Sequence, residues 1–310
     1  MNKAGYAYAV AAVRARTERL FSAEEAAWLW TADEPAVKRA LQNKGWQTDR
    51  PAEEMARARR QEAWAFVTSI APDAKALRFL LMPEEFCNVF LCTAWQMGSG
   101  EAGPVWARPC LTPPGVLTQA AKEKDERRLP GYLQKSAQAA WQTPRPGPAL
   151  MRWLQREKRA AMIQLAEKSG SPQLSTLARA MAQAEADKAL MYGAVYEQDK
   201  EELLERLGPG GDNARAIEAA VRGPRALCAF WQAQDGEKAL AAETMSPAVF
   251  EAWRDGQVLK TAWMLARDSF SPAALAAYWL QTKAETQEVC LRLLPGEPAH
   301  MRERGRLQYA

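Results

Sequence analysis

The sequence predicts an all-α protein, on three observations. Ala, Leu, Glu, Gln, Lys and Arg, which favour helices, dominate almost every segment. Stretches of Val, Ile and Thr in strict alternation, which would indicate a sheet, are missing. Residues that begin or end helices recur along the chain. Over 310 residues, 48% apolar and 25% charged residues are typical of an ordinary globular protein.

The first helix is expected near residues 6–20. Its apolar face recurs every three or four residues, at Tyr6, Val10, Val13, Thr17 and Leu20. This spacing continues through the charges that follow the apolar start. We therefore expect an amphipathic helix that is kept in the mature protein, rather than a signal peptide.

Later helices are marked by their ends. Ser22 and Glu25 have the spacing of a capping box, in which each side chain binds a backbone N–H near the other. Ser246-Pro247 and Ser271-Pro272 each place an N-cap before a first-turn proline. Gly208, followed by proline, ends a long charged helix.

Segments rich in proline and glycine divide the chain into thirds. One extends from residue 98 to 115 and another from 208 to 211, with a short one at 143–148 between them. The first and last of these predict three domains, covering residues 1–112, 113–212 and 213–310.

Each third carries a long helix with a similar acidic element. The elements begin at Glu85, Asp187 and Glu285, and three residues later stand Asn88, Leu190 and Glu288. Acids at this spacing commonly form a solvated helix face, but copies about 100 residues apart favour an internal repeat.

The last copy lies on a clearly amphipathic helix. Its apolar stripe consists of Leu275, Trp279, Thr282, Thr286, Val289 and Leu293. Lys283, Glu285 and Glu288 fall off this stripe. We therefore expect the two acids to face away from the local core, toward solvent or an enclosed central space.

The sequence lacks the motifs of most enzymes. The single histidine, His300, excludes a multi-histidine metal site. There is no phosphate-binding P-loop and no GxSxG nucleophile motif, so we expect no catalysis and no cofactor. Five cysteines without a CxxC pair indicate reduced, mostly buried thiols in the cytosol. No apolar run reaches the roughly 18–20 residues that span a bilayer.

Nucleic acid is a poor candidate for a partner. The chain has 41 Lys and Arg against 37 Asp and Glu, a net charge of +4. Its arginine clusters at 57–60 and 302–306 have glutamates among or beside them, which favours salt-bridged helix faces. Most of the twelve tryptophans occur with other apolar residues at helical spacing and are expected in the core.

Taken in order, several short segments resemble a known family, the C/d subunits of archaeal and vacuolar-type ATPases. They are residues 6–16, 20–22, 85–89, 111–115, 129–130, 254–255, 273–278, 283–285 and 301–307. Their order, their spacing and the total length carry the resemblance, which covers the whole chain. Departures from the family pattern are Glu85 for an aspartate, Phe90 for a lysine, Leu190 for an asparagine, and Glu288.

The resemblance implies a rotor part without catalytic activity. Such a subunit has three similar helical-bundle domains around a central funnel. It lies peripherally on the cytoplasmic face of the membrane, one copy in each complex. Its partners are the central-stalk subunits and the membrane ring of proteolipid subunits, and it transmits torque between them for proton or sodium transport.

Eight residues are candidates for contact with the stalk or the ring. They are Glu85, Asn88, Asp187, Glu285, Glu288, Arg302, Arg304 and Arg306. We expect the first five near the central cavity, where they orient helix ends or contact the stalk. Local structural hydrogen bonding explains them equally well, and an exposed tail equally explains the arginines. The alternative function is a generic all-helical scaffold or adaptor unrelated to the rotary ATPases.

Overall fold

The computed structural model describes residues 3–98, 105–143, 146–210, 212–268 and 270–293. This part of the chain is all-helical, as predicted, with fifteen α-helices, two short 3-10 helices and no strand. No helix within it combines the length and the apolar character that crossing a bilayer requires.

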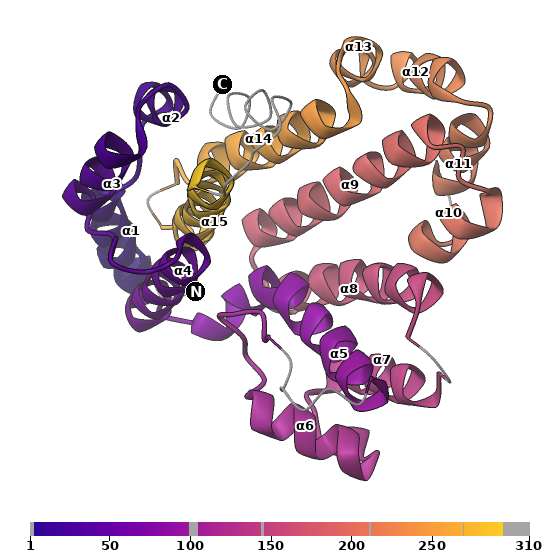
Figure 1. The fold of residues 1–310 in the computed structure, drawn as a ribbon, viewed down its shortest axis with the longest axis horizontal. Coiled ribbons are helices and arrows are strands. Elements are labelled where there is room, and N and C mark those ends of the chain that lie inside the picture. The colour runs from indigo at the N-terminus through magenta and orange to yellow at the C-terminus, as the bar shows by residue number, and fades with distance from the viewer. Residues whose placement is uncertain (1–2, 99–104, 144–145, 211, 269, 294–310) are drawn as a thin grey trace.

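The helices form three groups in space (Figure 1). The group at the left consists of α1 (Lys3–Thr17), α2 (Ala23–Leu29), α3 (Glu34–Asn43), α4 (Ala52–Ile70) and the C-terminal α15 (Ala273–Leu293). The group at the bottom follows the 3-10 helix η1 (Ala74–Leu81) and consists of α5 (Met82–Met97), α6 (Pro114–Glu123), η2 (Glu126–Arg128), α7 (Gly131–Gln142) and α8 (Pro148–Lys168). The remaining group consists of α9 (Pro172–Val195), α10 (Lys200–Leu207), α11 (Asp212–Val221), α12 (Pro224–Gln232), α13 (Gly236–Thr244) and α14 (Pro247–Leu265).

The helix ends predicted at Ser22, Ser246 and Gly208 are confirmed. However, the helix that Gly208 ends, α10, has only 8 residues and is not long, and α15 begins at Ala273, one residue later than Ser271-Pro272 predicted. Ser22 and Glu25 form both hydrogen bonds of the capping box at the start of α2. Ser246 caps α14 through the Val249 N–H. Gly208 follows α10 with a φ of 83°, a left-handed conformation that a residue with a Cβ atom rarely adopts.

The hydrophobic cores do not follow the predicted thirds. The largest core runs from Tyr6 to Trp279 and draws residues from all three. A second core, between Ala186 and Phe250, crosses the boundary at residue 212, and a third joins α2–α4 to Val289 of α15. The boundaries therefore stay a prediction from the sequence, and the packing links the thirds to one another.

The C-terminal helix is buried on more sides than its apolar stripe predicted. α15 packs against α1 and α4 on one side and against α9 and α14 on another. Leu275, Trp279 and Val289 are buried as expected. Glu285 and Glu288 do not face solvent, the first of the two expected alternatives, because both side chains are buried, at 1% and 3% exposure. Their position beside an enclosed central space stays a prediction.

Two further expectations need correction. The five cysteines are free thiols, but only Cys92 is fully buried and the other four are half-buried. Trp231 and Trp279 lie in the cores as expected, whereas Trp28 is 44% exposed. The seven-residue helix α2 lies at the edge of the described structure in Figure 1.

Candidate interaction site: a charged groove along α9

A charged groove runs along α9, which lies between α8 and α14 (Figure 1). It consists of two adjoining cavities of about 250 and 190 Å³ that share Glu185, Lys188 and Glu251. We call it the α9 groove. Its walls also include further residues of α9 and residues of α5, α8, α10, α14 and α15: Pro83, Gln155, Lys158, Arg159, Met181, Ala184, Tyr192, Arg206, Asp255, Val258, Leu259, Leu280, Lys283, Ala284 and Gln287.

Ion pairs across the α9 groove join α9 to the helices on both sides. Lys158 of α8 lies 2.8 Å from Glu185, and Lys188 lies 2.8 Å from Asp255 of α14. Lys188 also lies 3.9 Å from Glu251, which accepts a hydrogen bond from the Tyr192 hydroxyl at 3.1 Å. These contacts tie three long helices together through charges rather than apolar packing.

The surroundings of Glu185 and Lys188 favour the charged form of each. Burial opposes the charge of Glu185, but Lys158 and Lys188 outweigh burial and hold its pKa below the ordinary value. Burial also opposes the charge of Lys188, but Asp255 and Glu251 outweigh it and raise the pKa of that lysine. The α9 groove is therefore a charged surface at neutral pH.

The end of the groove near α10 is cationic. Arg159 of α8 is buried and donates a hydrogen bond to the carbonyl oxygen of Arg206. Burial lowers the pKa of both arginines, and the charge of Glu185 offsets part of that effect. Lys158, Arg159 and Arg206 all line this end of the groove, and cationic groups suit contact with acidic groups of a partner.

The structure places Glu85 and Asn88 away from the α9 groove, against the segment that leads into α6. Glu85 is buried and accepts hydrogen bonds from the backbone N–H groups of Leu111 (2.7 Å) and Thr112 (3.1 Å), from the Thr112 hydroxyl (2.6 Å) and from the Tyr132 hydroxyl (3.1 Å). Asn88 binds both backbone groups of Ala107, donating to its oxygen at 3.1 Å and accepting from its nitrogen at 2.7 Å.

Glu285 and Glu288 lie on α15, the first against the segment that leads into α2 and the second against the residue that ends α2. Glu285 accepts a hydrogen bond from the Phe21 N–H at 2.9 Å, and Glu288 accepts one from the Trp30 indole N–H at 3.1 Å. Burial raises the pKa of Glu285 to about 7, and the Phe21 amide and the charge of Arg59 only partly offset it.

Asp187 comes just before Lys188 of the α9 groove in sequence but does not line the groove. It is fully buried and forms ion pairs with Arg254 of α14 at 2.9 Å and Lys238 of α13 at 3.4 Å. Gln183 also donates to it at 3.0 Å. Among the described residues, Asp187 therefore binds side chains and no backbone amide.

Two of the three acidic elements have the same contact. Glu85 binds the amide of Thr112, and Glu285 binds the amide of Phe21. Each of those amides lies one residue before the N-cap of a short helix, α6 or α2. In both places a buried carboxylate on a long helix fixes the start of a short one, as an acceptor for backbone N–H groups.

The predicted candidates are thus spread over three places. Glu85 and Asn88 share one, Glu285 and Glu288 another, and Asp187 the third, while residues 302–306 lie outside the described part of the chain. Contact with a partner stays a prediction for all eight candidates. Sequence reasoning missed the α9 groove, although Glu251 and Asp255, four residues apart on one helix face, were a signal for it.

No family model matches the chain. The curated proteins likewise give no match. Within the described residues, no group of three or more His, Cys, Asp or Glu side chains is placed to hold a metal ion. The charged side chains that line the α9 groove are suited to polar contact with another macromolecule.

Proposed function

We propose that this chain is a non-catalytic rotor subunit of a vacuolar- or archaeal-type ATPase. It links the central stalk to the membrane ring of proteolipid subunits and transmits torque for ion transport. In this proposal it has three similar helical units around a central funnel and works as one copy per complex, peripherally, on the cytoplasmic face of the membrane.

The observation that carries the proposal is a repeated order of helices. The series α5, α6, α7, α8 is a long helix, two short ones and a long one. The series α15, α2, α3, α4 has the same order when α15 is placed first and α1, which precedes α2 in the chain, is left out. The shared contact of Glu85 and Glu285 lies at the same step of both series, between the first helix and the second.

The remaining helices give weaker support for a third unit. Two long helices, α9 and α14, again enclose short ones, here α10 to α13. Asp187 on α9 and Arg254 on α14 form a buried ion pair, and Glu285 on α15 lies within electrostatic reach of the buried Arg59 on α4. In both units a carboxylate on the first long helix faces an arginine on the last.

The α9 groove suits the mechanical role. A torque coupler needs a stiff body and polar surfaces that dock reversibly. The ion pairs of Lys158 and Lys188 tie α8, α9 and α14 together. Charged side chains that line the groove favour specific, reversible binding of a partner. In addition, α15 packs against α1 and α4 and so links the last third of the sequence to the first helices of the chain.

The proposal is tested by co-purification with the two central-stalk subunits encoded in the same genome, read by native mass spectrometry. Gln155→Arg and Gln287→Arg add bulk and charge inside the α9 groove, and neither glutamine side chain has a hydrogen bond that its loss would break within the described residues. We expect wild-type protein to form a stoichiometric ternary complex, and the double variant to lose it while its circular dichroism and melting temperature stay unchanged.

Gln138→Arg, on the exposed face of α7, is the matched control and is expected to retain the complex. A complex that resists both groove substitutions would keep the stalk partner but exclude the α9 groove as its site. No complex at low or moderate salt, even with the proteolipid ring present, would contradict the rotor proposal and favour a scaffold outside this family.

A further inference from the structure

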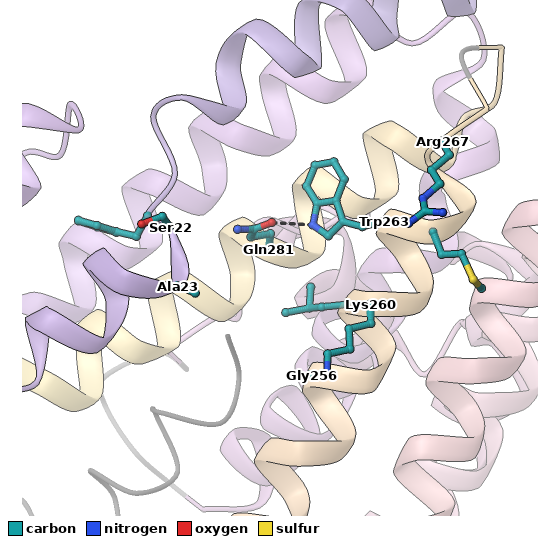
Figure 2. Close-up of a pocket in the computed structure, with 10 residues that line it drawn as sticks. Ser22, Ala23, Gly256, Lys260, Trp263, Arg267 and Gln281 are labelled. Atoms are coloured by element: carbon teal, nitrogen blue, oxygen red, sulfur yellow. Dashed lines mark hydrogen bonds between the residues drawn. The ribbon is translucent and has the colours of Figure 1, made fainter. Parts of the chain in front are cut away.

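A second groove lies on the other side of α14, between that helix and the start of α2. Figure 2 shows its lining, which comes from α14, from α15 and from the residues around Ser22. Its volume is about 450 Å³. We call it the α14–α2 groove. It shares only Leu259 with the α9 groove, so it is a separate surface.

The floor of the α14–α2 groove is apolar and fixed. Phe21, Leu259 and Trp263 line it, and Met264 at its edge is 57% exposed. The Trp263 indole N–H donates to Gln281 Oε1 of α15 at 2.6 Å, as Figure 2 shows. Because this bond satisfies the polar edge of the ring and holds its orientation, the tryptophan presents apolar surface to an occupant.

The walls of the groove carry two cations, Lys260 and Arg267, and no acidic residue lines it in the described part of the chain. Neither side chain has a hydrogen bond or ion pair there. Lys260 lies on α14, and Arg267 follows two residues after the helix ends at Leu265. The two cations are seven residues apart, a separation that spans about 10 Å on an α-helix of a partner.

Acids close to the lining in sequence form no ion pair with these cations in the described structure. Glu25 of α2 lies 2.9 Å from Lys44, and Asp268 accepts a hydrogen bond from the Phe270 N–H at 2.9 Å. Glu24, next to Ala23 of the lining, is exposed. Within the described residues, the charges of Lys260 and Arg267 are therefore open to a partner.

We propose that the α14–α2 groove binds an acidic, amphipathic helical segment of a partner protein. Two carboxylates about two helical turns apart on that segment match Lys260 and Arg267, and apolar side chains between them cover Trp263 and Met264. The proposal holds whether or not the chain is a rotor subunit, because it depends only on this groove.

Other occupants fit the groove less well. Residues 294–310 carry three arginines and two glutamates, so a basic segment would meet basic walls. An anionic bilayer is flat and broad, whereas the apolar surface here lies between two helices in a concave groove. A helix with carboxylates on one face satisfies both the charge and the shape.

The test uses the full chain and a fluorescein-labelled helical peptide with two glutamates seven residues apart and leucines between them. Fluorescence anisotropy measures binding, and the same peptide with both glutamates replaced by glutamine is the ligand control. We expect saturable binding to wild-type protein. Lys260→Glu and Arg267→Glu are each expected to weaken it by about tenfold. Lys122→Glu, an equal change of charge on exposed α6, is expected to leave it unchanged.

Several results would overturn the proposal. One is no saturable binding, and another is equal weakening by Lys122→Glu, which would indicate unspecific attraction. Light scattering that shows a dimer abolished by Lys260→Glu would assign the groove to a second copy of the chain. Peptide binding that appears only after residues 294–310 are removed would assign it to that segment. Pelleting with phosphatidylserine vesicles, lost in Lys260→Glu while peptide binding is absent, would assign it to a membrane surface.

Discussion

Glu285 is a buried carboxyl group with one strong hydrogen bond, from the Phe21 amide, and no ion pair among the described residues. Its other carboxylate oxygen has no hydrogen-bond partner there. The neutral acid is therefore favoured in the folded protein, and its pKa rises to about 7. A carboxyl group that fixes the start of α2 in this way makes stability depend on pH.

Glu285→Gln is expected to stabilise the protein at pH 8 and to have a much smaller effect at pH 5. The folded-state pKa lies above the ordinary value of 4.5, so the folded protein holds this proton more tightly than the unfolded chain. The contribution of this proton to the free energy of unfolding is fully present below about pH 4.5 and is lost as pH rises through about 7. Glutamine stays neutral at every pH, so at pH 8 the variant is expected to exceed wild type in free energy of unfolding by at most about 3 kcal/mol. Urea denaturation at both pH values measures it, with the exposed Glu243→Gln as control. A gain of equal size at both pH values would contradict the assignment to Glu285.

Asn88→Asp is expected to destabilise the protein by about 1–3 kcal/mol. Asn88 donates to the Ala107 carbonyl and accepts from the Ala107 amide. Aspartate keeps the acceptor but places a second oxygen against the carbonyl, so a donor is lost in a buried position. Thermal unfolding measures the change, with the exposed Gln138→Glu as control. Unchanged stability would mean that this contact does not hold the segment before α6.

At the scale of elements, the buried sides of α15 connect two groups of helices. Lys283 of α15 lies 2.6 Å from Glu84 of α5, and Glu84 is itself buried. Both helices also carry the acids that fix α2 and α6, so the pair joins the two corresponding long helices directly.

Lys283→Met is expected to destabilise the protein by about 2–4 kcal/mol, because it leaves the Glu84 carboxylate buried without a counter-charge. Adding Glu84→Gln to that variant is expected to restore most of the loss, since the remaining groups are then neutral. The four free energies of unfolding from urea titrations form a double-mutant cycle. Additive effects of the two substitutions would show that the pair contributes no coupling between α5 and α15.

At the scale of the whole molecule, the largest core joins the two ends of the chain. Leu275 of α15 belongs to the same cluster as Val10 of α1, Val67 of α4 and Met162 of α8. The cluster that contains Ile217 and Leu227 is separate. Stability is therefore expected to divide along these cores rather than along consecutive thirds of the sequence.

Leu275→Ala tests this division. The residue is fully buried, so the substitution is expected to cost about 2–5 kcal/mol. Hydrogen exchange measured by mass spectrometry should show faster exchange in α1, α4 and α8 together, with α11 and α12 little changed. Faster exchange confined to residues 213–293 would instead support unfolding by thirds.

The sequence alone determined the helical class and many helix ends, because propensity and capping act over a few residues. Ser22, Ser246 and Gly208 each do what their local pattern indicated. The repeated acids at 85, 187 and 285 were also visible in the sequence, but their partners were not. Thr112 lies 27 residues from Glu85 and Phe21 lies 264 residues from Glu285, so only the folded chain brings them together.

The tertiary structure decided which charged residues are buried and which line a groove. On α9, Asp187 and Lys188 are neighbours in sequence, yet the first is sealed against α13 and α14 and the second lines the α9 groove. A helix turns about 100° per residue, so adjacent side chains face different neighbours. Periodicity predicts one buried face for a helix, but α15 is covered on several sides because the chain returns to its beginning. The packing of α15 against α1 and α4 joins segments far apart in the sequence, so the pattern of residues within α15 alone does not predict it.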